Sequence, residues 1–178
     1  YIKRNSKITK KKFKADAIIT NQEKLPIGIL TADCVPILIY DKNKNFISAI
    51  HAGWKGAYKG VINNTINFLL KNGSNRKNLV AVIGPCISEK NYEIKKNFKD
   101  KFIKKNPANK KFFRLRKKKS YFCLNDYVYS QLRNLGIKNL EVIKKNTFYT
   151  KNNFFSARRA LSLNHDDYGR NISIIMLN

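Results

Sequence analysis

Cys34 and His51 are the two side chains whose types best suit a shared metal ion. Cysteine sulfur and histidine nitrogen are preferred ligands of Zn²⁺, and a catalytic zinc site usually has three protein ligands and an open position for water. Two other interpretations stay open at this point. Cys34 can be a packed thiol beside a hydrogen-bonded histidine, or it can be a nucleophile for which His51 serves as the base.

The segments around these residues predict a hairpin that brings the two side chains together. Two runs rich in Ile and Val flank a polar stretch, and they predict two strands and a four-residue loop at residues 35–40, 46–51 and 41–44. This loop pairs Tyr40 with Asn45, and therefore Cys34 with His51. Directly opposed side chains share a face, with Cβ atoms about 4.5–5.5 Å apart, whereas a slip of one residue would send them to opposite faces.

The remaining elements follow from the same patterns. Short runs of apolar and β-branched residues predict strands at residues 15–20, 27–31, 79–83, 140–143 and 172–177. Apolar residues at helical spacing over residues 58–69, 94–102 and 128–135 predict three helices. The first would start after Gly56 and stop at residues 71–73, the second would end at Asn106-Pro107, and Gly136 would cap the third. Strands and helices do not alternate strictly. The sequence therefore predicts an α+β (mixed α/β) fold, a single domain over residues 1–178 with mixed β-sheets flanked by helices.

Composition narrows the class of protein. The chain has 178 residues and a formal net charge of +26. No run approaches the roughly 18 apolar residues that cross a bilayer, and three cysteines do not make a disulfide framework. We therefore expect a cytoplasmic protein with no membrane partner.

The positive charge alone suggests a non-catalytic domain that binds nucleic acid. However, the basic residues are 29 Lys against 8 Arg, and reading of base edges favours the bidentate Arg side chain. An A/T-rich codon bias, which would raise Lys, Asn and Ile together, explains the excess more simply. We expect no specific nucleic-acid partner and keep this function as an alternative.

Several motifs, in order along the chain, resemble the YfiH-like laccase-domain family, also known as the multicopper polyphenol oxidase or purine nucleoside phosphorylase family. The motifs begin with Ala-Asp-Ala-Ile-Ile-Thr and include Thr-Ala-Asp-Cys-Val-Pro and His-Ala-Gly-Trp-Lys-Gly; they lie at residues 15–20, 31–38, 51–56, 83–87, 92–94, 154–159 and 168–170. The resemblance runs from about residue 15 to the C-terminus. It implies an N-terminally truncated member of the family.

The resemblance also implies a zinc site made by two His and one Cys. Cys34 and His51 match two of these ligands, and the family's third ligand is a His that would precede Tyr1. His165 is the one other histidine of the sequence, and it could substitute in principle.

The family carries two kinds of activity. Multicopper oxidation of phenols needs many imidazole ligands, and this chain has two His, so a copper-containing polyphenol oxidase is the alternative. The resemblance otherwise implies a zinc-dependent purine nucleoside phosphorylase, acting on adenosine, inosine, guanosine and methylthioadenosine with phosphate, and with adenosine deaminase activity.

Six further residues are candidates for catalysis or substrate binding. Asp33 would orient a ligand or transfer a proton, and Trp54 would stack on the purine ring. Cationic side chains would hold phosphate: Lys55 and Arg170, taken as catalytic, and Arg158 and Arg159, taken as phosphate ligands. Asp33 can instead be a strand-end carboxylate bonded to backbone amides, and Trp54 can be a packed core side chain. Cys86 and Cys123 are expected to be packed thiols.

Overall fold

Five strands form the central sheet of the structure, a computed structural model that describes residues 1, 14–165 and 167–178. Their order is β1-β4-β3-β5-β9, and all neighbours are antiparallel except the parallel pair β5 and β9. The strands are β1 (Ala17–Thr20), β3 (Val35–Asp41), β4 (Ile47–Ala52), β5 (Leu79–Ile83) and β9 (Asn139–Val142).

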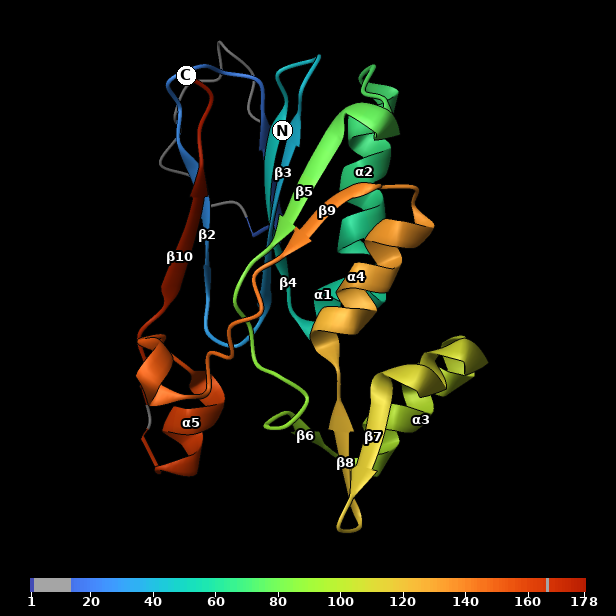
Figure 1. The fold of residues 1–178 in the computed structure, drawn as a ribbon, viewed down its shortest axis with the longest axis vertical. Coiled ribbons are helices and arrows are strands. Elements are labelled where there is room, and N and C mark those ends of the chain that lie inside the picture. The colour runs from blue at the N-terminus through green and yellow to red at the C-terminus, as the bar shows by residue number, and fades with distance from the viewer. Residues whose placement is uncertain (2–13, 166) are drawn as a thin grey trace.

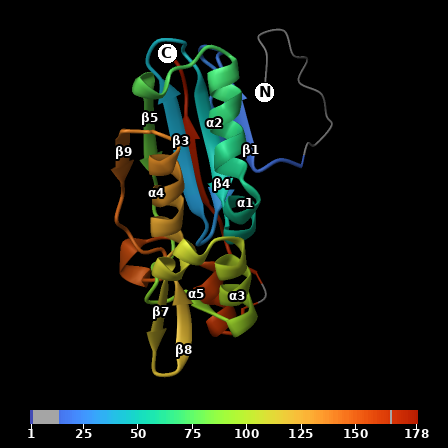
Figure 2. The same cartoon turned by 90° about the vertical axis from the view of Figure 1, so that its right-hand side faces the viewer.

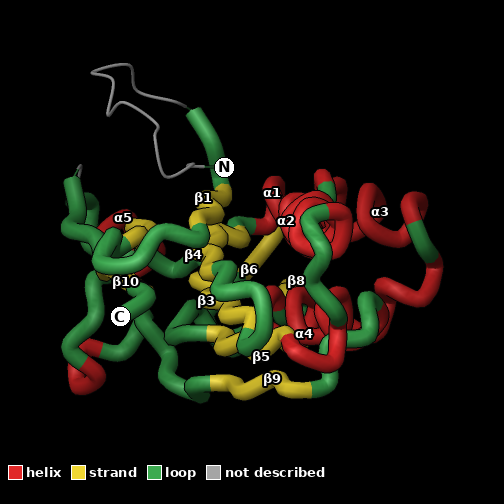
Figure 3. The backbone as a smooth tube through the Cα atoms, turned by 90° about the horizontal axis from the view of Figure 1, so that it is seen from above, coloured by secondary structure: helices red, strands yellow, loops and turns green. Residues whose placement is uncertain are grey.

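Both faces of this sheet are covered, which gives the molecule three layers (Figures 1 and 3). A two-stranded antiparallel ribbon of β2 (Ile27–Thr31) and β10 (Asn171–Ile175) packs on one face, and apolar side chains from both layers form a small core there. The opposite face is covered by α1 (Trp54–Lys59), α2 (Val61–Lys71) and α4 (Leu124–Asn134). Because both faces are buried, β3 is nearly continuously apolar.

A third, smaller sheet projects from one end of the central sheet (Figure 2). It consists of β6 (Glu93–Ile94), β7 (Phe113–Arg116) and β8 (Lys119–Phe122) in the order β6-β8-β7, and α3 (Lys96–Lys105) packs beside it. Aromatic rings join this part to the main core: Phe102 lies 5.0 Å from Phe122 and 5.2 Å from Tyr127, measured between ring centroids. The projection is therefore a packed part of the fold.

The predicted fold class is confirmed, and two strands, residues 27–31 and 79–83, have the predicted bounds. The helix predicted over residues 58–69 is wrong in one respect, because Gly60 adopts φ 93° and divides it into α1 and α2. The helix predicted from residue 94 begins later, at Lys96, since Ile94 lies in β6. Several elements were not predicted: the β7–β8 hairpin, α5 (Ala157–Ser162), and 3₁₀ helices at Arg76–Asn78, Pro107–Phe112 and Thr150–Asn152.

The predicted hairpin pairing is wrong by two residues. The structure pairs Tyr40 with Ile47 and Pro36 with His51. The loop has the predicted length but starts one residue later, because Asp41 remains in the strand and its carboxylate accepts hydrogen bonds from the next turn's amides. A shift of two residues preserves which face each side chain points to, so Cys34 and His51 remain on the same side of the hairpin as diagonal neighbours.

Within the described residues, no helix is both long enough and apolar enough to cross a membrane.

Candidate functional site

Cys34 and His51 converge beside Gly53, the residue that precedes α1. A Cβ atom added to Gly53 would lie 3.0 Å from Cys34 Sγ and 3.7 Å from His51 Nε2. The sulfur and the ring nitrogen therefore border the same small space, which is open because residue 53 has no side chain. The Sγ and Nε2 donors are of the two types that Zn²⁺ prefers.

Asp16 orients the imidazole. Its Oδ1 lies 3.4 Å from His51 Nδ1, and its carbonyl accepts a hydrogen bond of 2.8 Å from the His51 backbone amide. A carboxylate on Nδ1 leaves Nε2 available, which is the usual arrangement around a metal-binding histidine. Sequence reasoning did not assign Asp16 a role, although a carboxylate at the start of an apolar strand was a usable signal.

A cavity of about 820 Å³ opens over these side chains. Its lining combines the Cys34–His51 pair with residues from β1, α1 and α2. Lys55 is exposed and borders this cavity, as does Lys59 one helical turn later. Because α1 has six residues, any anion bound here would be held by the lysine charges and not by a helix terminus.

Burial controls the state of the thiol. It raises the pKa of Cys34 to about 11, and the carboxylates of Asp33 and Asp16 add to the shift. The free thiol is therefore protonated and uncharged near neutral pH. This argues against a thiolate nucleophile activated by His51, whereas a metal ligand gives up its proton when the metal binds.

Asp33 lies directly before Cys34 but is fully engaged elsewhere. Its buried carboxylate accepts hydrogen bonds from Thr147 Oγ1 at 2.6 Å, Ser156 Oγ at 2.9 Å and the Arg158 amide at 2.7 Å. Its φ of 79° lies in the left-handed region, which Asp tolerates better than most residues. These contacts support a positioning role, in which Asp33 ties the Cys34 loop to the loop before α5.

Arg158 and Trp54 border a second cavity of about 570 Å³. The Arg158 guanidinium lies 5.3 Å from the centre of the Tyr92 ring and donates to the Glu93 carbonyl at 2.9 Å. Burial raises the pKa of the Tyr92 hydroxyl well above its usual range, and Cys34 in its thiolate form would raise it further.

The Trp54 ring packs against Phe98, with 4.9 Å between the ring centroids, and borders both cavities. Trp54 is therefore a packed ring that also borders both cavities, and its contact with a purine stays a prediction.

Two predicted phosphate ligands are not brought to either cavity. The Arg159 guanidinium donates to the carbonyls of Thr147, Phe148 and Phe154 at 3.0, 2.8 and 2.7 Å. Arg170 is exposed, and its guanidinium stacks 4.1 Å from the centre of the Tyr168 ring. Both side chains therefore stabilise the C-terminal loops.

The second histidine and the other two cysteines of the sequence lie outside the site of Cys34 and His51. His165 is exposed beyond α5 and is not part of the cavity lining. Cys86 and Cys123 are buried free thiols, as predicted, and line a separate cavity of about 290 Å³. Among residues 1, 14–165 and 167–178 there is no group of three His, Cys, Asp or Glu side chains that could hold a metal ion. The described residues thus supply two ligands for a metal ion, Cys34 and His51, and not the three protein ligands usual for catalytic zinc.

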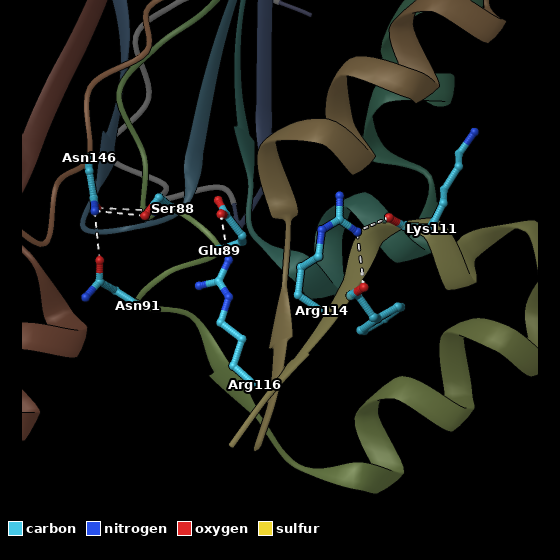
Figure 4. A network of polar contacts seen from close by, with 8 residues as sticks. Ser88, Glu89, Asn91, Lys111, Arg114, Arg116 and Asn146 are labelled. Atoms are coloured by element: carbon cyan, nitrogen blue, oxygen red, sulfur yellow. Dashed lines mark hydrogen bonds and ion pairs between the residues drawn. The ribbon is translucent and has the colours of Figure 1, made fainter. Parts of the chain in front are cut away.

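An asparagine that sequence reasoning missed braces the loops behind the site (Figure 4). Asn146 Nδ2 donates to Ser88 Oγ at 2.9 Å and to Asn91 Oδ1 at 2.8 Å, and its Oδ1 accepts from the Ser88 amide. The contacts join the segment that leads to Tyr92 with the segment that carries Thr147. Nothing in the spacing of these residues signalled the contact.

Comparisons with known proteins agree with this architecture. Residues 2–178 match the family described as "Multi-copper polyphenol oxidoreductase laccase". A purine nucleoside phosphorylase of Rickettsia conorii is 34% identical over 160 residues, which are 89% of this chain and 65% of the relative. One from Aquifex aeolicus is 36% identical over 132 residues, 74% of this chain and 59% of the relative.

A solved structure supports the same conclusion about the fold. The crystal structure of Bacillus licheniformis hypothetical protein YfiH superposes with a TM-score of 0.81 and 31% identity, over 92% of this chain and 61% of that one. The chain thus spans about 60% of the length of the relatives it matches.

Proposed function

Because this chain belongs to the multi-copper polyphenol oxidoreductase laccase family, whose curated relatives include purine nucleoside phosphorylases, we propose that it is a zinc-dependent purine nucleoside phosphorylase. The observation that carries the proposal is the convergence of Cys34 Sγ and His51 Nε2 beside Gly53, at the edge of a large cavity. The proposed substrates are purine nucleosides and inorganic phosphate.

In this proposal Cys34 and His51 hold the zinc ion, and Asp16 keeps the imidazole oriented through Nδ1. Bound zinc supplies Lewis acidity and can lower the pKa of a coordinated water to about 7. Two donors fall short of the three protein ligands usual for catalytic zinc. A further ligand is therefore part of the proposal, and zinc affinity of this chain is the quantity to measure first.

Phosphorolysis needs phosphate beside the anomeric carbon of the sugar. A phosphate oxygen bonds to C1′, the bond from C1′ to the purine nitrogen breaks, and the base leaves with a proton. Lys55 is the cation best situated to attract phosphate, since it is exposed at the cavity that contains Cys34. Trp54 lines the same cavity and would contact the purine. Arg158 borders the adjoining cavity and would add positive charge.

We extend the proposal to adenosine deamination, in which the cavity would bind adenosine and water without phosphate. Water would replace the exocyclic amino group, giving inosine and ammonia. The two reactions share the nucleoside, so the same side chains would orient it. They differ in their requirement for phosphate, which makes them separable in one assay.

The test combines metal analysis with nucleoside turnover by the purified chain. We expect bound zinc, release of adenine from adenosine that depends on phosphate, and inosine formation that does not. Cys34→Ser and His51→Ala should abolish both metal and turnover, whereas Cys123→Ser, a buried thiol outside the cavity, should keep them. Copper with oxygen uptake on phenols would instead identify a polyphenol oxidase, and full metal content in both ligand variants would disprove the assignment.

A further inference from the structure

About a third of the basic residues of this chain lie in one part of the described fold. Residues 95–119 contain thirteen Lys and Arg and one acidic residue, Asp100. This segment, which we call the basic module, comprises α3, the following 3₁₀ helix, β7 and the first residue of β8. It forms most of the projection at the end of the molecule (Figures 1 and 2). A general codon bias does not by itself explain such a local density.

The charges of the basic module are exposed and mostly unneutralised. All of the thirteen except Lys99 are exposed. Within the part of the chain that the structure describes, two of them form ion pairs, Arg116 with Glu89 and Lys119 with Glu93, each at 3.0 Å. The others have no carboxylate partner among the described residues, although Arg114 donates to backbone carbonyls and Lys101 and Lys105 lie over the Tyr58 ring. Such a surface attracts polyanions by releasing their counterions.

The tip of the β7–β8 hairpin gives a second, independent observation. Its two-residue turn is Lys117-Lys118, and both residues have positive φ, 45° and 63°. Turns of this kind favour Asn-Gly, because L side chains are strained in the left-handed region. Lysine therefore occupies two positions where an L side chain costs conformational energy, and strain of this kind is often linked to function.

We infer that the basic module is a docking surface for the phosphate backbone of nucleic acid, bound without sequence specificity. A membrane is a poorer fit, because Leu115 is the one large exposed apolar side chain of residues 95–119, and bilayer docking also needs apolar contact. The surface lies outside the cavity of Cys34 and His51. Lys95 also borders the second cavity, beside Arg158. The test therefore uses Lys117 and Lys118, which line neither cavity, so that its outcome is separable from the proposed enzymatic function.

The experiment measures binding of a short oligouridine by fluorescence anisotropy over a range of KCl concentrations. The test variant is Lys117→Asn with Lys118→Gly, which removes two charges and relaxes the turn. The matched control is Lys42→Gln with Lys77→Gln, which removes two exposed charges near the opposite end of the central sheet. We expect the test variant to lower the slope of log K against log salt by about 1.4, since each contact to a single strand contributes about 0.7.

Thermal unfolding separates loss of binding from loss of fold. The test variant should melt at the same temperature or higher, because its turn is less strained, and Lys117→Gln with Lys118→Gln should give the same binding loss with the original backbone. Equal losses in test and control variants would show that net charge alone drives binding and would overturn the inference. Tighter binding to anionic lipid vesicles than to oligouridine, or no binding at low salt, would overturn it as well.

Discussion

Gly53 shows how one missing side chain can define a site. Its φ of −67° and ψ of 162° are available to any residue, so the backbone conformation does not require glycine here. The missing Cβ instead leaves space beside the Cys34 side chain. The Cβ of an alanine would lie 3.0 Å from Cys34 Sγ, in the space that a shared metal ion needs. At the residue scale, the proposed metal site therefore depends on a glycine as well as on its two ligands.

The first prediction concerns that space. Gly53→Ala should reduce zinc affinity by at least tenfold, measured by competition with a chromophoric chelator, while the fold remains. The matched control is Gly56→Ala in the same cavity, where the added Cβ would meet no atom closer than 3.4 Å. Gly56 lies inside α1, so this control should gain about 0.5–1 kcal/mol of stability. Equal zinc affinity in both variants would contradict the site.

A second prediction concerns the orientation of His51. Asp16→Asn weakens the contact to Nδ1, and loss of such an outer-shell partner typically costs 10–100-fold in metal affinity. We expect a loss of about that size in zinc titrations, with little change in stability because Asp16 is more than half exposed. Glu141→Gln, an exposed substitution on β9, provides the control. An unchanged zinc affinity for Asp16→Asn would exclude its positioning role.

The third prediction concerns the Cys34 thiol. With a pKa of about 11, it forms about 100-fold less thiolate at pH 8 than a thiol with a pKa of 9. Alkylation of the metal-free protein should therefore be slow at pH 8 and rise about tenfold per pH unit up to about pH 11. Added zinc should suppress it. Burial raises the pKa values of Cys86 and Cys123 to about 12, so Cys34→Ser should be alkylated more slowly than the parent at every pH. Fast alkylation of the parent at pH 7 would instead support an activated nucleophile.

At the element scale, Asp33 joins loops that are distant in the sequence. Its three hydrogen bonds connect the turn between β2 and β3 to the residues before α5, where Ser156 also caps the helix by accepting from the Arg159 amide. Asp33→Asn keeps the tolerance for positive φ but removes the charge from buried bonds. We expect a loss of about 2–3 kcal/mol in urea unfolding, and about 1 kcal/mol for Ser156→Ala.

The double variant tests whether these residues act as one unit. If they do, the combined loss should be smaller than the sum of the single losses. Additive losses would indicate that Ser156 acts through the helix cap alone. Arg158 provides a functional readout, because its backbone amide is the third donor to Asp33.

Elements with strong periodic patterns were predictable from the sequence, and their exact junctions were not. β2 and β5 were placed correctly because each is a short run rich in Ile, Val and Leu, with Pro26 directly before β2 and Gly84-Pro85 directly after β5. The pairing of β3 with β4 was displaced because Asp41 was assigned to the loop, whereas its side chain closes the turn from within the strand. The β7–β8 hairpin was missed because its turn is Lys-Lys, where the expected signal is Asn-Gly.

The candidate site, like the fold, was predictable from the sequence only in part. Two strands and a short loop were enough to bring Cys34 and His51 to one face, since a register error of two residues does not change the face. The roles of Arg158 and Arg159 could not be separated, because neighbouring residues of a short helix point in different directions. The fold sends one guanidinium toward Tyr92 and the other to backbone carbonyls.

At the scale of the whole molecule, net charge opposes folding. The chain carries a formal charge of +26. Within residues 1, 14–165 and 167–178 the ion pairs made by Lys or Arg are Arg116 with Glu89 and Lys119 with Glu93, and both are partly exposed. Partly exposed pairs contribute little to stability, whereas repulsion among many cations acts over the Debye length, about 10 Å at 0.1 M salt. Salt should therefore stabilise this protein.

We expect the melting temperature, followed by circular dichroism, to rise as NaCl increases from millimolar to moderate concentrations. Lys42→Glu with Lys77→Glu lowers the net charge by four and should melt higher than the parent at low salt. Because screening weakens the repulsion that both substitutions relieve, this difference should shrink as salt is added. A melting temperature that falls with salt would mean that attractive pairs outweigh the repulsion, and a difference that persists at high salt would point to local effects of the substitutions.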